Sequence, residues 1–92
     1  MDAEVYLNHP TFGLLFRICS LEAQRELFAT LYAQRLFFVV QADQDGTAFE
    51  PISRSDARSL VETQLRHLRR SGQTQEYSQL QRAHKQTFQF SP

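Results

Sequence analysis

The chain has 92 residues, of which ten are basic and ten acidic, so its formal net charge at pH 7 is zero. A chain this short forms at most one compact unit with a small core. Its neutral balance argues against a DNA reader, because such domains are strongly basic. The balance hides an asymmetry: residues 1–53 carry three basic and seven acidic side chains, and residues 54–92 carry seven and three. Two segments of opposite sign indicate two pieces with different surfaces.

Residues 5–52 have the pattern of short strands. A first short strand over 5–7 ends at His9-Pro10, and side chains alternate over 12–19, 27–32 and 35–41. Asp45-Gly46 is a hairpin turn signal before a return strand over 47–50. Gly13 lies where a strand would bend or bulge. Five short antiparallel strands with tight connections predict a small, strongly bent barrel.

From Ser53 onward the spacing of apolar residues becomes helical. Ser53 fits an N-cap with Asp56 in the first turn, and Gly72 fits the position just after the last turn. Glu62 and Arg66 have the spacing of an i,i+4 ion pair. The predicted apolar stripe comprises Ala57, Leu60, Val61, Leu65 and Leu68.

A second helix is predicted to begin near Thr74 and to carry Tyr77, Leu80, His84 and Phe88 on one stripe. The connection between the helices is short, which favours an antiparallel hairpin. The expected fold class is therefore α+β, with a small bent five-stranded antiparallel barrel in residues 1–53 followed by a two-helix hairpin in residues 54–92.

The segment YAQRLFFVV (residues 32–40) is apolar on both faces of a strand. Leu36 and Phe38 share one side, and Phe37 and Val39 share the other. A small barrel has only one inside, so the second face is either covered or a docking surface. We expect docking: the helices use their apolar stripes on each other, Leu36 and Phe38 stay exposed, and Phe37 and Val39 point inward. A hairpin that covers this face is the alternative.

Catalysis has little support in the sequence. The three histidines are far apart, and no nucleophile motif, phosphate-binding loop or paired-cysteine pattern is present. Cys19, the only cysteine, is interpreted as a packed thiol, and His84 as a packed or capping histidine. We expect no catalytic residue, cofactor or metal, and neither a signal peptide nor a membrane-spanning segment.

Nucleic-acid binding is the alternative function. The segment RHLRR (residues 66–70) concentrates positive charge in one helical turn. A small nucleic-acid-binding protein could use this Arg-rich helix, although the neutral charge of the whole chain disfavours it.

Four segments carry a resemblance to a known family: YLNHPTFGLLFRIC, LYAQRLFFVV, FEPISRSDAR and LRHLRRSGQ. In these the chain resembles the cyanobacterial PII-interacting protein X (PipX) family. The resemblance implies an amino-terminal Tudor-like (SH3-like) domain, two following helices and no enzymatic activity. It also implies a coactivator that binds the 2-oxoglutarate-loaded NtcA dimer, a nitrogen regulator of the CRP type. The PII trimer would sequester this coactivator when 2-oxoglutarate is low and ADP is high.

The same resemblance implies which positions meet the two partners. These positions are Glu4, Tyr6, His9, Phe12, Tyr32, Gln34, Arg35, Leu36 and Phe38. PII and NtcA would compete for one apolar patch, which leaves the basic helices free to contact RNA polymerase or another regulator. We expect a cytoplasmic protein that is a monomer when free and contacts neither nucleic acid nor membrane directly.

Overall fold

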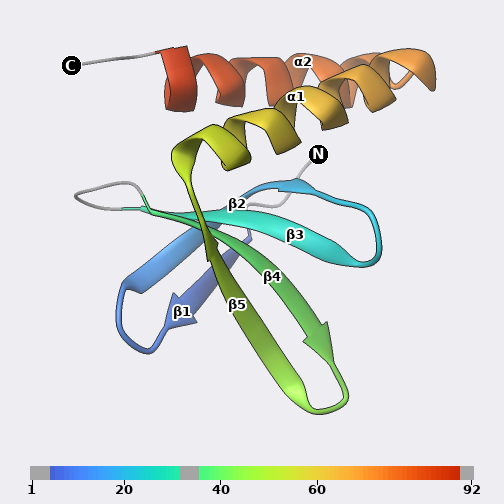
Figure 1. Ribbon diagram of the computed structural model, residues 1–92. Coiled ribbons are helices and arrows are strands. Elements are labelled where there is room, and N and C mark those ends of the chain that lie inside the picture. Colours follow the sequence, from blue (N-terminus) through green and yellow to red (C-terminus); the bar gives the residue numbers. More distant parts are fainter. Residues whose placement is uncertain (1–4, 32–35, 90–92) are drawn as a thin grey trace.

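The structure is a computed structural model that describes residues 5–31 and 36–89 (Figure 1). Five strands are followed by two α-helices and a final π-helical turn, which confirms the predicted α+β fold. The elements are β1 (Tyr6–His9), β2 (Gly13–Ser20), β3 (Arg25–Thr30), β4 (Phe37–Asp43), β5 (Gly46–Ile52), α1 (Arg54–Arg70), α2 (Thr74–His84) and η1 (Lys85–Gln89).

The five strands form one antiparallel sheet in the order β1-β2-β3-β4-β5. The sheet curls into a half-barrel, and both helices lie on the same side of it (Figure 1). The register of β2 against β3 shifts between Arg17 and Cys19, so the bulge lies there and not at Gly13. Gly13 instead has a φ of +80° at the start of β2, a conformation that favours glycine.

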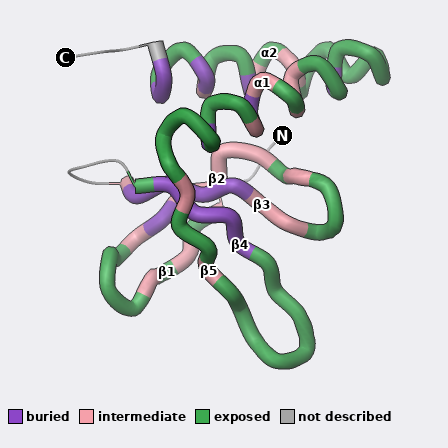
Figure 2. The backbone as a smooth tube through the Cα atoms, viewed as in Figure 1, coloured by how far each residue is buried: buried purple, intermediate pink, exposed green. Residues whose placement is uncertain are grey.

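The buried residues form two separate groups of side chains. The most deeply buried parts of the sheet lie in the middle strands (Figure 2). The core between the sheet and the helices contains Leu27, Ala29, Phe37, Ala57, Val61, Leu68, Leu80 and Phe88. The core inside the curl contains Leu15, Phe28, Phe38 and Val40. Alternation along β4 explains this division, because successive side chains point to opposite faces. The predicted parity of residues 36–40 is therefore confirmed.

The helices cover the Phe37 face of the sheet. The ring of Phe37 stacks on Phe88 with a centroid distance of 5.5 Å and an interplanar angle of 21°. Val61 and Leu68 of α1 belong to the same core. The prediction that the helices use their apolar stripes only on each other was wrong, because the same residues also bury the sheet.

Both ends of α1 follow the sequence signals. The Asp56 backbone N–H donates to Ser53 Oγ at 3.0 Å, which confirms the N-cap. Gly72 has a φ of +74°, and the Gln73 N–H donates to the carbonyl of Leu68 at 3.0 Å. This is the Schellman arrangement that ends a helix with a left-handed residue.

The partners of Glu62 differ from the predicted pair with Arg66. The Glu62 carboxylate lies 3.1 Å from His84 Nε2 and accepts a hydrogen bond from Arg58 Nε, also at 3.1 Å. These two bonds lower the pKa of the Glu62 carboxyl below its ordinary value. Arg66 donates to Thr63 Oγ1 instead. Glu62 therefore links α1 to the end of α2.

Candidate protein-docking surface

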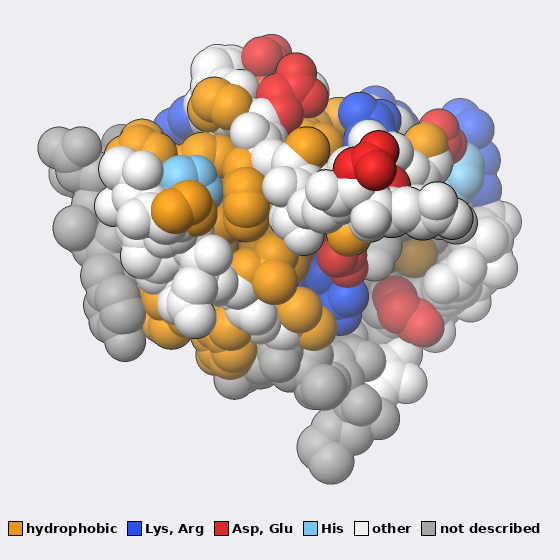
Figure 3. Space-filling model, turned by 90° about the horizontal axis from the view of Figure 1, so that it is seen from below, with side chains coloured by type: hydrophobic (Ala, Val, Ile, Leu, Met, Phe, Trp, Pro, Cys, Tyr) orange, Lys and Arg blue, Asp and Glu red, His pale blue; other side chains and the backbone are white. Residues whose placement is uncertain are grey.

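An aromatic patch lies on the side of the sheet away from the helices. We use this name for His9, Phe12, Leu36, Phe38, Phe49 and Pro51, which line a hollow of about 300 Å³ together with Phe37 and Ile52. Seen from this side, hydrophobic side chains spread broadly over the surface (Figure 3). The aromatic patch draws on the turn after β1, the start of β4 and the end of β5.

The turn after β1 positions Phe12. His9 Nδ1 accepts hydrogen bonds from the backbone N–H groups of Thr11 at 3.0 Å and Phe12 at 3.1 Å. Pro10 presets the backbone for such a turn. The His9 ring then lies 4.9 Å from the Phe12 ring, measured between centroids. Phe12 remains 47% exposed, so this turn presents an apolar ring to solvent.

Phe38 forms the floor of the aromatic patch and is only 3% exposed. Its ring centroid lies 5.1 Å from that of His9 and 5.7 Å from that of Phe12. Phe49 contacts it edge-on at 6.4 Å. The expectation that Phe38 is exposed was therefore wrong. The barrel itself buries this residue, with rings from the β1 turn and from β5.

Leu36 is held at the rim by a residue that the sequence analysis did not single out. The Leu36 N–H donates to Thr30 Oγ1 at 2.9 Å, and its carbonyl accepts the Thr30 N–H at 3.0 Å. Thr30 is only 4% exposed, whereas Leu36 is 38% exposed. A buried threonine thus fixes an exposed leucine. Phe49 was also missed, although a phenylalanine among smaller or polar residues in the return strand over 47–50 is a usable signal.

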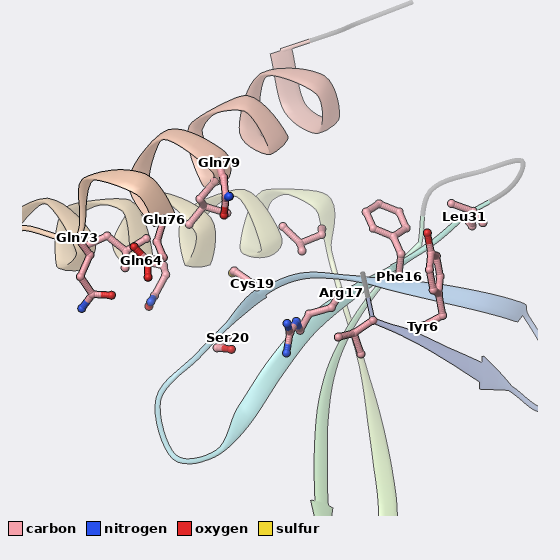
Figure 4. A pocket seen from close by; sticks show the side chains of 14 residues that line it. Tyr6, Phe16, Arg17, Cys19, Ser20, Leu31, Gln64, Gln73, Glu76 and Gln79 are labelled. Carbon is pink, nitrogen blue, oxygen red and sulfur yellow. The ribbon is translucent and has the colours of Figure 1, made fainter. Parts of the chain in front are cut away.

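Tyr6 lies on the other face of the sheet. It pairs with Phe16 across β1 and β2, and both line a cleft of about 740 Å³ between the strands and the helices. Tyr6 and Phe16 lie together at one end of this cleft, and the glutamines at its helical wall lie opposite (Figure 4). Tyr6 is 43% exposed. The structure therefore brings His9, Phe12, Leu36 and Phe38 together but separates Tyr6 from them.

Four of the predicted contact residues, Glu4, Tyr32, Gln34 and Arg35, lie outside the described residues.

The basic residues of α1 are divided between two environments. Arg66, His67, Arg69 and Arg70 are exposed near its carboxyl end, where His67 Nε2 lies 4.0 Å from Glu22 Oε1. Arg54, at the other end, donates from Nη2 to the Phe88 carbonyl at 3.2 Å and lies 5.6 Å from the centre of the Phe88 ring. Arg54 therefore links η1 to α1, while the basic side chains of the RHLRR segment face solvent.

Cys19 and His84 are packed, as expected. Burial raises the pKa of the Cys19 thiol to about 12, against the opposing charge of Arg17. His84 is 8% exposed and contacts the Phe88 ring. No three His, Cys, Asp or Glu residues within 5–31 and 36–89 are grouped as metal ligands. In that part of the chain, each helix is too short or too polar to cross a membrane.

The chain was compared with models of known protein families and with curated proteins. The family model described as PipX, PII-interacting protein X, matches residues 3–88. No curated protein matches the chain significantly.

Proposed function

The chain belongs to the PII-interacting protein X family, and on this premise we propose that it is a non-enzymatic regulator that binds the PII trimer and the NtcA dimer in turn. In this proposal it coactivates transcription with 2-oxoglutarate-loaded NtcA. PII sequesters it when 2-oxoglutarate is low and ADP is high. It works in the cytoplasm and is a monomer when free.

The observation that supports a docking role is the aromatic patch. Phe12 and Leu36 are 47% and 38% exposed above the buried ring of Phe38. Large apolar side chains on a rigid, buried support lose little freedom on binding, which favours them as interface anchors. The hollow of about 300 Å³ between them is large enough for an apolar side chain of a partner. No charged side chain belongs to its described lining, so an uncharged aliphatic group fits it best.

A shared patch explains how PII would control NtcA. Two proteins that cover the same side chains cannot bind together, so PII removes the coactivator by mass action. If the chain binds only the 2-oxoglutarate-loaded form of NtcA, it stabilises that form by the difference in affinity. Linkage then requires that it tighten 2-oxoglutarate binding by the same factor. The effector has no need to touch this chain.

Competition is the direct test. We expect the chain to bind PII with ADP and NtcA with 2-oxoglutarate, and excess PII to displace it from NtcA. Phe12→Ala and Leu36→Ala should weaken both complexes, whereas Gln75→Ala, at an exposed position on α2, should leave both unchanged. A stable ternary complex on size-exclusion chromatography would refute the shared patch.

The exposed RHLRR turn is the proposed contact for a third protein, RNA polymerase or another regulator. The carboxyl-terminal half cannot simply be removed to test this, because α1 and α2 bury Phe37 and Leu27. Arg69→Glu with Arg70→Glu changes only exposed side chains. The double variant should bind NtcA normally and activate transcription less. Full activation would contradict the third contact.

The alternative of a nucleic-acid-binding protein makes a different prediction. An Arg-rich helix that contacts phosphates binds random DNA with an affinity that falls steeply with salt. We expect no binding of the purified chain to random DNA at physiological salt. Binding that the Arg69→Glu and Arg70→Glu changes abolish would favour this alternative.

A further inference from the structure

The ring of His9 is a hydrogen-bond acceptor in the aromatic patch. Its Nδ1 accepts two backbone N–H bonds, from Thr11 at 3.0 Å and from Phe12 at 3.1 Å. A ring nitrogen accepts a hydrogen bond only when it carries no proton. The two hydrogen bonds therefore assign the neutral tautomer, with its single proton on Nε2, to this arrangement.

The same ring is packed between three phenyl groups. Its centroid lies 4.9 Å from Phe12, 5.1 Å from Phe38 and 4.8 Å from Phe49. These contacts remain possible in either charge state, whereas the two hydrogen bonds do not. Protonation at Nδ1 would place a third N–H group against the backbone N–H groups of Thr11 and Phe12. Both bonds would be lost, and the turn that presents Phe12 would be held less firmly.

Within the described residues, no charged side chain forms an ion pair or hydrogen bond with His9. Phe12 and Phe38 contribute only rings, and β5 contributes Phe49. Glu50 follows Phe49, but it pairs with Val39 and so points to the other face of the sheet. If His9 gained a proton, no carboxylate among the described residues would form an ion pair with it in this arrangement.

We propose that His9 is a positioning residue that holds Phe12 in the aromatic patch only while its imidazole is neutral, so that the affinity of the patch for PII falls as the pH is lowered. Histidine is the side chain whose charge ordinarily changes between pH 5 and 8. The part of this inference that concerns affinity rests on the proposed function. The part that concerns the turn does not depend on any partner.

The first experiment therefore uses the free chain. NMR spectra recorded between pH 7.5 and 5.5 should show the backbone N–H signals of Thr11 and Phe12 shifting with the same midpoint as the His9 ring protons. The protection of these two amides, expressed relative to the intrinsic exchange rate at each pH, should fall below that midpoint. Amides that do not respond to the titration of His9 would overturn the inference, whether or not PII binds.

The second experiment measures the affinity for the PII trimer by calorimetry across the same pH range. One linked proton weakens binding by at most about tenfold per pH unit. His9→Asn keeps an acceptor for the N–H two residues on but has no proton to gain. It should bind less tightly at pH 7.5, because the ring contacts are lost, and its affinity should change less with pH than that of the wild type.

Two further variants separate the hydrogen bonds from other effects. His9→Phe keeps a ring without an acceptor, so low protection of the Thr11 and Phe12 amides is expected at every pH. His67→Gln and His84→Gln, away from the aromatic patch, should retain the pH dependence. A pH dependence as steep in His9→Asn as in the wild type would overturn the inference, because it would then originate in PII or elsewhere. Absence of PII binding at every pH would instead refute the proposed function.

Discussion

Phe37 and Phe38 are neighbours in β4, and each is buried in a different core. Phe37 is 2% exposed and stacks on Phe88 of η1, while Phe38 is 3% exposed and contacts His9 of β1. β4 is thus the wall between the core under the helices and the floor of the aromatic patch. A substitution of either phenylalanine therefore acts on folding, whereas a change at the exposed Leu36, just before β4, acts on binding.

Phe38→Ala should mainly lower the unfolding free energy of the protein, because Phe38 is a core residue. Removal of a fully buried phenylalanine ring costs about 3–5 kcal/mol of unfolding free energy. Leu36→Ala should cost less than about 1 kcal/mol, because Leu36 is already 38% exposed, and should weaken PII binding in a folded protein. Urea denaturation and calorimetry separate the two effects. A Phe38→Ala protein as stable as the wild type would show that this ring is not a core residue.

Phe88→Ala should loosen the carboxyl-terminal segment. This ring is 5% exposed, stacks on Phe37 and lies beneath Arg54. The expected loss in unfolding free energy is about 3 kcal/mol, with faster amide exchange in α2 and η1. Gln86→Ala, at an exposed neighbouring position, is the matched control. Equal exchange rates in the two variants would mean that the Phe88 contact does not hold the segment.

The alternation of side chains correctly separates Phe37 from Phe38, because strand geometry fixes which residues share a face. It could not decide what covers each face. Phe37 is covered by Phe88, about fifty residues further along the chain, and only the docking angle of the helices brings them together. Phe38 is covered by His9, Phe12 and Phe49. These rings meet because the curl of the sheet brings its two edge strands, β1 and β5, close together.

Local signals were more reliable than contacts between distant elements. Ser53 and Gly72 mark the ends of α1 in both sequence and structure, since capping depends on a few adjacent residues. Glu62 was assigned to Arg66 by spacing, yet it binds Arg58, which has the same spacing, and His84 of α2. Thr30 was not singled out, although a threonine in an apolar strand often has a partner for its hydroxyl group.

Cys19 should react slowly in the native protein. Because burial raises the pKa of its thiol to about 12, the thiolate fraction at pH 8 should be much smaller than for an ordinary cysteine. We expect labelling by iodoacetamide at pH 8 to be slow in buffer and fast in urea. A native rate within tenfold of the unfolded rate would show that the thiol is accessible and ionises normally.

Glu62 should make the stability of the helical hairpin depend on pH. Hydrogen bonds from His84 and Arg58 lower the pKa of its carboxyl in the folded protein, so the folded state favours the charged form more than the unfolded state does. Its contribution is complete above the pH at which unfolded glutamates titrate, and is lost as the pH falls through the lower folded-state pKa. Glu62→Gln should therefore be less stable than the wild type at pH 6, and the difference should shrink on acidification. Thermal denaturation at several pH values measures this, with Glu50→Gln, an exposed position on β5, as the control. A Glu62→Gln deficit that stays constant down to pH 3 would mean that packing, rather than the charge on Glu62, joins α1 to α2.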